Sequence, residues 1–66
     1  MTNPLMATFT DDTQAVAAVT DLLNAGFLNV EHERDGADSL VIVDPGNRAT
    51  DVRRIFVAHG GKELTD

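Results

Sequence analysis

The stretch Phe9-Thr10-Asp11-Asp12-Thr13-Gln14-Ala15 decides the fold, because its counterpart Val43-Asp44-Pro45-Gly46-Asn47-Arg48-Ala49 lies about 34 residues later in the chain. Each stretch leads from a short apolar segment through a polar turn into an apolar stripe at helical spacing, and then to a glycine, Gly26 or Gly60. This order is typical of a β-α-β unit. Two such units in tandem predict a split β-α-β domain.

Two helices are expected, over Asp12–Ala25 and Arg48–His59. Thr10, Asp11 and Asp12 can cap the first helix, and Gly26 supplies the left-handed residue that commonly ends one. The turn Asp44-Pro45-Gly46-Asn47 should lead to a cap for the second. The apolar stripes that should face a sheet are Ala15, Val16, Val19, Leu22 and Leu23 in the first helix, and Ala49, Val52, Ile55, Phe56 and His59 in the second.

Four strands are expected, over Leu5–Thr10, Leu28–Arg34, Ser39–Val43 and Lys62–Thr65. Asp35-Gly36 predicts a hairpin between the second and third strands. The charged second strand suits a sheet edge, whereas the third is apolar on both faces and should be central. With right-handed crossovers, the order β-α-β-β-α-β predicts an α+β ferredoxin-like fold. We expect one domain over residues 1–66, with a four-stranded antiparallel sheet and two helices on one face.

Composition limits the function. A chain of 66 residues has a thin stability margin, which oligomerisation would widen. Its net charge of −6 argues against nucleic-acid and anionic-membrane partners. The absence of cysteine excludes disulfides and thiolate catalysis. Because Met1-Thr2-Asn3-Pro4 lacks the basic and apolar regions of a signal peptide, we expect a cytoplasmic protein.

Several segments carry a family resemblance: Phe9-Thr10-Asp11-Asp12, Ala15, Ala18-Val19, Leu22, Ala25-Gly26-Phe27, Leu40-Val41-Ile42-Val43, Arg48-Ala49, Asp51, Arg53-Arg54-Ile55 and His59-Gly60. Together they resemble the small bacterial heat-induced general stress proteins of the YflT type. The resemblance implies a bacterial stress-response protein with no established catalytic site. One position departs from the pattern, because Gly61 stands where alanine is expected.

The residues that suggest chemistry also have structural explanations. Asp11-Asp12 could bind a divalent cation, but adjacent acids at a helix start are explained by capping. His32 and His59 could form a metal site, but the glutamates beside His32 point to the opposite face of its strand. Ser39 has no neighbouring histidine-acid set to activate it. We therefore expect no metal, cofactor or catalytic residue, and no enzymatic activity.

One loop is a candidate anion site. Gly46, Asn47 and Arg48 could hold an anion with free N–H groups at the start of the second helix. Asp44 adds repulsion, and the loop lacks the glycine spacing of phosphate-binding loops. An ordinary turn and cap is the preferred interpretation.

Other proteins with this fold supply alternative functions. An RNA-recognition module needs stacking aromatics on its central strands, but Phe9, Phe27 and Phe56 are assigned to packing. Acylphosphatase-like enzymes need a basic anion loop, and Thr10-Asp11-Asp12-Thr13 is acidic. A small-molecule-sensing domain resembling ACT domains, with its ligand at a dimer interface, remains the alternative, although the glycine expected after the first strand is missing.

The preferred function is a non-enzymatic stress-type protein that acts through self-association or a protein partner. Its predicted homodimer interface is the helix-free face of the sheet, with Met6, Thr8, Leu40 and Ile42. Polar side chains should rim this face: Thr8, Asn29, Glu31, Glu33 and Glu63. An apolar centre with a polar border is the usual form of an interaction surface.

Overall fold

The computed structural model describes residues 4–64, with only the backbone described at Asp35. Its elements are β1 (Leu5–Phe9), α1 (Asp12–Asn24), β2 (Val30–Asp35), β3 (Asp38–Val43), α2 (Ala49–Ala58) and β4 (Lys62–Leu64). The predictions made for Met1-Thr2-Asn3 and for Thr65 lie outside the described residues.

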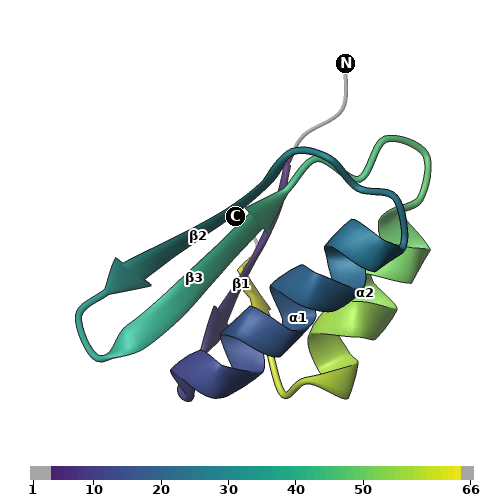
Figure 1. The fold of residues 1–66 in the computed structure, drawn as a ribbon. Helices are drawn as coiled ribbons and strands as arrows, with labels where there is room; N and C mark the ends of the chain where they lie inside the picture. The colour runs from purple at the N-terminus through teal and green to yellow at the C-terminus, as the bar shows by residue number, and fades with distance from the viewer. Residues whose placement is uncertain (1–3, 65–66) are drawn as a thin grey trace.

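The strands form one antiparallel sheet in the order β2-β3-β1-β4. Both helices lie on the same side of this sheet (Figure 1), which confirms the ferredoxin-like prediction. The apolar strands β1 and β3 are central, and the charged β2 and the short β4 are the edges. Asp35 and Asp38 pair across a two-residue loop in which Gly36 has a φ of 66°. The glycine thus supplies the positive φ that a tight hairpin requires.

Both helices end in the same hydrogen-bonded motif. After α1, Gly26 N donates to Leu23 O and Phe27 N donates to Leu22 O, each at 3.1 Å. After α2, Gly60 N donates to Val57 O at 3.0 Å, and Gly61 N donates to Phe56 O at 2.7 Å. Gly26 and Gly60 have φ values of 100° and 77°. These are Schellman terminations, so the glycine repeat in the sequence is explained by two equivalent chain reversals.

The two helices start differently. Asp11 is the N-cap of α1, and its Oδ1 accepts a hydrogen bond from Thr13 N at 2.9 Å. Arg48 is the N-cap of α2 and makes no side-chain capping hydrogen bond. The predicted turn at Asp44 thus leads to an N-cap residue, but this residue does not cap the helix with its side chain. Asp44 Oδ1 instead accepts from Gly46 N at 3.1 Å, which stabilises the turn itself.

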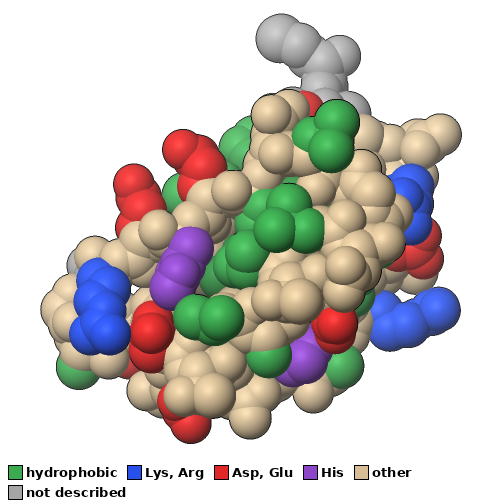
Figure 2. Space-filling model, in the orientation of Figure 1, with side chains coloured by type: hydrophobic (Ala, Val, Ile, Leu, Met, Phe, Trp, Pro, Cys, Tyr) green, Lys and Arg blue, Asp and Glu red, His purple; other side chains and the backbone are tan. Residues whose placement is uncertain are grey.

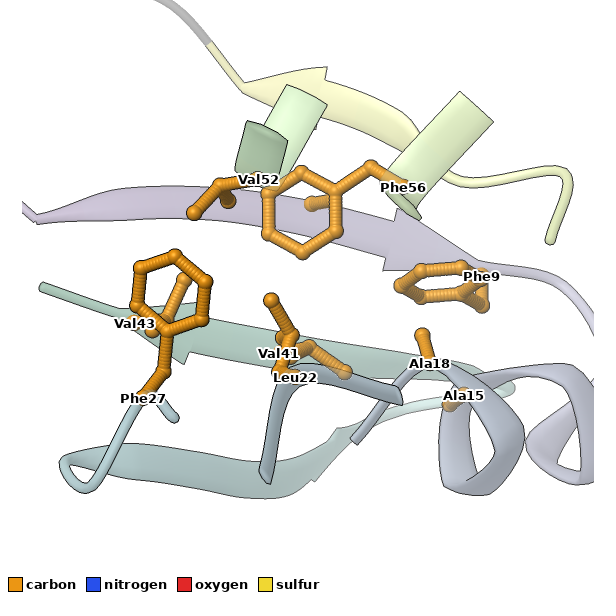
Figure 3. Packing of buried hydrophobic residues seen from close by; sticks show 10 residues of the cluster. Phe9, Ala15, Ala18, Leu22, Phe27, Val41, Val43, Val52 and Phe56 are labelled. Carbon is orange, nitrogen blue, oxygen red and sulfur yellow. The ribbon is translucent and has the colours of Figure 1, made fainter. Parts of the chain in front are cut away.

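The core lies between the helices and the inward face of the sheet. Its buried apolar members are Ala7, Phe9, Ala15, Ala18, Leu22, Phe27, Val41, Val43, Val52 and Phe56. Within the core the rings of Phe9 and Phe56 pack edge to face, with centroids 6.1 Å apart (Figure 3). Each large apolar side chain buried in this way contributes about 1.5–3 kcal/mol to folding. The inward faces of the central strands β1 and β3 are therefore used for stability.

Of the five glycines, Gly61 is the one that lies closest to the core side chains. A Cβ atom at this position would lie 2.5 Å from Cζ of Phe9 and 3.0 Å from the carbonyl oxygen of Phe56. Phe9 is 1% exposed, so its ring is in close contact with the residues around it. This close contact explains why the chain carries glycine at position 61.

Two predictions about the positions of apolar residues are wrong. Val16 and Leu23 were expected to face the sheet, but they are 47% and 51% exposed on the outer side of α1. The inward stripe of α1 is formed by the buried Ala15, Ala18 and Leu22, with Val19 partly buried against the same core. Leu28 was expected in the second strand, but it precedes β2 and is 87% exposed.

Candidate functional site

The helix-free side of the sheet is the first candidate, and we call it the open face. Ala7, Phe9, Val41 and Val43 are buried toward the helices, so the alternate residues of β1 and β3 point the other way. The open face consists of Met6, Thr8, Leu40, Ile42 and Leu64. Met6 pairs with Ile42 and Leu64, and Thr8 pairs with Leu40. Leu64, at the edge of this surface, is 42% exposed.

Charges of opposite sign flank the open face. On the β2 side, Glu31 and Glu33 pair with Ile42 and Leu40. On the β4 side, Lys62 pairs with Thr8. All three charged side chains are exposed. Since paired residues in neighbouring strands share a face, these side chains lie on the two borders of the open face.

Two expected rim residues lie elsewhere. Glu63 pairs with Ala7 and so points to the helix side, where its Oε1 accepts a hydrogen bond from Arg53 Nε at 2.9 Å. Asn29 precedes β2 and lines a surface hollow of about 320 Å³ beside the loop before α2. Leu64 and Lys62 were not predicted as members of this surface. Alternation of side chains along β4 places Leu64 and Lys62 on the open face, but only once the register of β4 against β1 is known.

A polar cluster around Asp12 is the second candidate. Ser39 Oγ donates to Asp12 Oδ1 at 2.6 Å, and His32 Nε2 lies 3.0 Å from the same oxygen. Arg34 Nη2 lies 3.5 Å from Asp12 Oδ2. The hydrogen bond from Ser39 lowers the pKa of Asp12, against the opposing effect of desolvation and with further lowering by Arg34 and His32. The first turn of α1 is thereby tied to both β2 and β3.

This cluster contains the three residue types of a catalytic triad, but the hydrogen bonds join them in a different order. In a working triad the histidine lies between serine and aspartate and accepts the serine proton. Here Asp12 lies between the other two, and the Ser39 hydroxyl donates to a carboxylate. Ser39 is also 3% exposed, so a substrate cannot reach its oxygen. The expectation that Ser39 has no histidine-acid set nearby is wrong, but the arrangement does not activate the hydroxyl.

The two histidines belong to separate pairs. His59 Nε2 lies 2.5 Å from Asp21 Oδ2, which joins the end of α2 to the C-terminal half of α1. His32 pairs with Asp12, as described above. Among the side chains that the structure describes, no group of three His, Cys, Asp or Glu residues is placed to hold a metal ion. Helix capping had accounted for Asp12 at the sequence level, so its role as a histidine partner was missed.

The predicted anion candidate is already engaged in contacts within the chain. Arg48 Nη1 donates to Ala25 O at 2.8 Å, and its Nε donates to Asp51 Oδ2 at 3.1 Å. Its guanidinium also stacks over the ring of Phe27, 4.5 Å from the centroid. Gly46 N donates to Asp44, and Arg48 N donates to Pro45 O at 2.9 Å. An anion at Gly46, Asn47 and Arg48 stays a prediction, and it would have to compete with these bonds.

Other surface features lie on the helix side or at the ends of the molecule. A hollow of about 260 Å³ lies between the turn after β1 and the end of α2, with Asp11, Gln14 and His59 in its wall. Hydrophobic side chains reach the surface over α1 (Figure 2), and Val57 on α2 is 74% exposed. In the described part of the chain, neither helix is long and apolar enough to cross a membrane.

The comparisons with known proteins return no relative from which a function could be taken. No family model matches this chain, and no curated protein or solved structure matches it. Function is therefore inferred from the geometry of the open face.

Proposed function

We propose that this protein is a non-enzymatic domain that acts by self-association through the open face. The observation that carries the proposal is the apolar centre of that face: Met6, Leu40, Ile42 and Leu64 lie side by side on the helix-free side of the sheet. A second copy would remove this surface from water at a gain of about 25 cal/mol per Å² of apolar area. For a chain of 66 residues, such a gain is a sizeable share of its stability.

A bacterial stress-response role in the cytoplasm is part of the same proposal and is supported by the sequence resemblance. Several residues of the resemblance have a structural role in this chain. Asp11 caps α1, and Gly26 and Gly60 reverse the chain after each helix. The resemblance thus includes fold-forming positions, while the residues of the open face supply the means of association.

Sedimentation equilibrium tests the proposal. We expect the unmodified protein to be dimeric at high micromolar concentration in moderate salt. Ile42→Glu places a charge in the centre of the open face and should give a monomer. Val57→Glu, which introduces the same charge on the exposed side of α2, should remain dimeric and is the matched control. Circular dichroism establishes that both variants are folded. A monomeric unmodified protein would overturn the proposal.

A second experiment separates this function from the alternative of ACT-like ligand sensing at a dimer interface. Native mass spectrometry of protein taken directly from its own cells reports subunit number and retained ligand together. Self-association alone predicts a dimer at the mass of two bare chains. A stoichiometric small molecule on the dimer, lost in Ile42→Glu, would favour the sensing alternative. Stoichiometric zinc or calcium retained after exhaustive dialysis, and lost in His32→Ala, would overturn the non-metal part of the proposal.

A further inference from the structure

The open face has charges of opposite sign at its two edges, which restricts how two copies can meet. Strand pairing aligns Glu33, Leu40, Thr8 and Lys62 in one row across the sheet. The next row contains Glu31, Ile42, Met6 and Leu64. Each row therefore begins with an acid on β2. Only the row of Glu33 ends with a base, Lys62 on β4.

The charged side chains at the two edges of the sheet act independently of each other. Since β2 and β4 are three strand spacings apart, their side chains are separated by about 14 Å. The Debye length at moderate salt is about 8–10 Å, so Lys62 does not neutralise the glutamates of its own chain. A partner that approaches the open face meets a negative border on one side and a positive border on the other.

Two copies that meet face to face can be related by a two-fold axis that is parallel or perpendicular to the strands. A perpendicular axis places β2 over β2, so that Glu33 of one copy lies over Glu31 of the other. A parallel axis places β2 over β4, so that Glu33 of each copy lies over Lys62 of the other. In this second case Leu40 lies over Thr8, and Ile42 lies over Met6. The apolar centre is covered in both cases, but only the parallel axis pairs opposite charges.

We propose that two copies of this chain associate open face to open face about a two-fold axis parallel to the strands, with Lys62 of each copy against Glu33 of the other. This inference rests on the self-association proposed above. Asp38 is the remaining acid that β3 places on this face. In this arrangement it lies over the end of the partner's β1, so it does not lie opposite another acid. Complementary borders fix the register of an interface, while the apolar centre supplies most of its energy.

Charge reversals at the two borders test the arrangement. Lys62→Glu places an acid against Glu33 at both equivalent contacts, and we expect it to raise the dimer dissociation constant about tenfold. Glu33→Lys should have a similar effect, because it places a second cation against Lys62. An equimolar mixture of the two variants should form a heterodimer about as tight as the unmodified homodimer. Both contacts of the heterodimer join opposite charges, whereas both contacts of each variant homodimer join like charges. The differences should shrink as salt rises.

The outcomes separate the arrangement from the underlying function. With β2 over β2, Glu33→Lys would tighten the homodimer and Lys62→Glu would leave it unchanged, and either result overturns the parallel axis. A homodimer that none of these substitutions affects overturns it as well. If the unmodified protein is monomeric, self-association itself is wrong. Lys62 and Glu33 are exposed and lie on edge strands, so these variants leave the core intact.

Discussion

Ser39 Oγ in the central strand β3 lies 2.6 Å from Asp12 Oδ1 in the first turn of α1. Asp12 therefore has two structural roles. Its carboxylate lies near the positive end of the helix, and it also accepts a hydrogen bond from the sheet that the helix covers.

The stability of the protein should depend on pH through Asp12. Its pKa is lowered in the folded state, chiefly by the hydrogen bond from Ser39. A carboxyl group with a lowered folded pKa stabilises the protein above its unfolded pKa, and this contribution is lost as the pH falls through the folded value. Asp12→Asn should therefore lower the free energy of unfolding at neutral pH and flatten its decline in acid, as measured by urea denaturation at a series of pH values.

Ser39→Ala is the companion variant. Without the hydroxyl, the pKa of Asp12 should rise toward its ordinary value, which NMR titration of the carboxyl carbon measures directly. An unchanged Asp12 titration in Ser39→Ala would show that the serine is not the main cause of the shift.

Arg48 should stabilise the end of α1 from the start of α2. Its guanidinium donates to Ala25 O and stacks on Phe27. Because the side chain is 44% exposed, we expect Arg48→Ala to cost only about 1 kcal/mol in chemical denaturation. Arg54→Ala is the control, since Arg54 is exposed and has no ion pair within residues 4–64. Equal effects of the two substitutions would contradict the assigned role of Arg48.

The pair of His59 and Asp21 should couple the two helices. A double-mutant cycle with His59→Ala and Asp21→Ala isolates their interaction from the separate effects of each change. We expect a coupling energy of about 0.5–1 kcal/mol, because Asp21 is 51% exposed and water screens the pair. Additive losses of stability would mean that the contact contributes nothing to folding.

Gly61→Ala should destabilise the protein by about 1–3 kcal/mol, because the new methyl group overlaps the Phe9 ring and the carbonyl oxygen of Phe56. Thermal unfolding measures the effect. In a Phe9→Leu background the added cost should be smaller, since the ring atoms nearest to Gly61 are absent. The same cost in both backgrounds would argue that the carbonyl of Phe56 alone limits the site.

The fold could be predicted because local signals and topology agreed. Gly26 and Gly60 mark both helix ends, Asp35-Gly36 marks the hairpin, and the alternation in β1 and β3 marks their inward face. One error arose where a periodic pattern in the sequence extends beyond the end of its strand. Leu28 continues the alternation of β2, but the chain is still crossing from the helix end to the sheet edge there.

The candidate site was only partly predictable. Met6 and Ile42 follow from the alternation within single strands, whereas placing Lys62 in the same row as Glu33 requires the register of every strand in the sheet. The contact of His32 with Asp12 joins residues of β2 and α1 that no local pattern relates. Spacing along one element cannot reveal such a contact, because it depends on how the helix is docked on the sheet.

The close approach of Gly61 to Phe9 also has a consequence for sequence divergence. A related chain can carry alanine at the position of Gly61 only if the residue at the position of Phe9 is smaller or its ring is displaced. These two positions, near opposite ends of the sequence, therefore constrain each other. A chain that acquires alanine and keeps phenylalanine has to shift the ring within the core, so we expect it to be destabilised unless the ring is displaced.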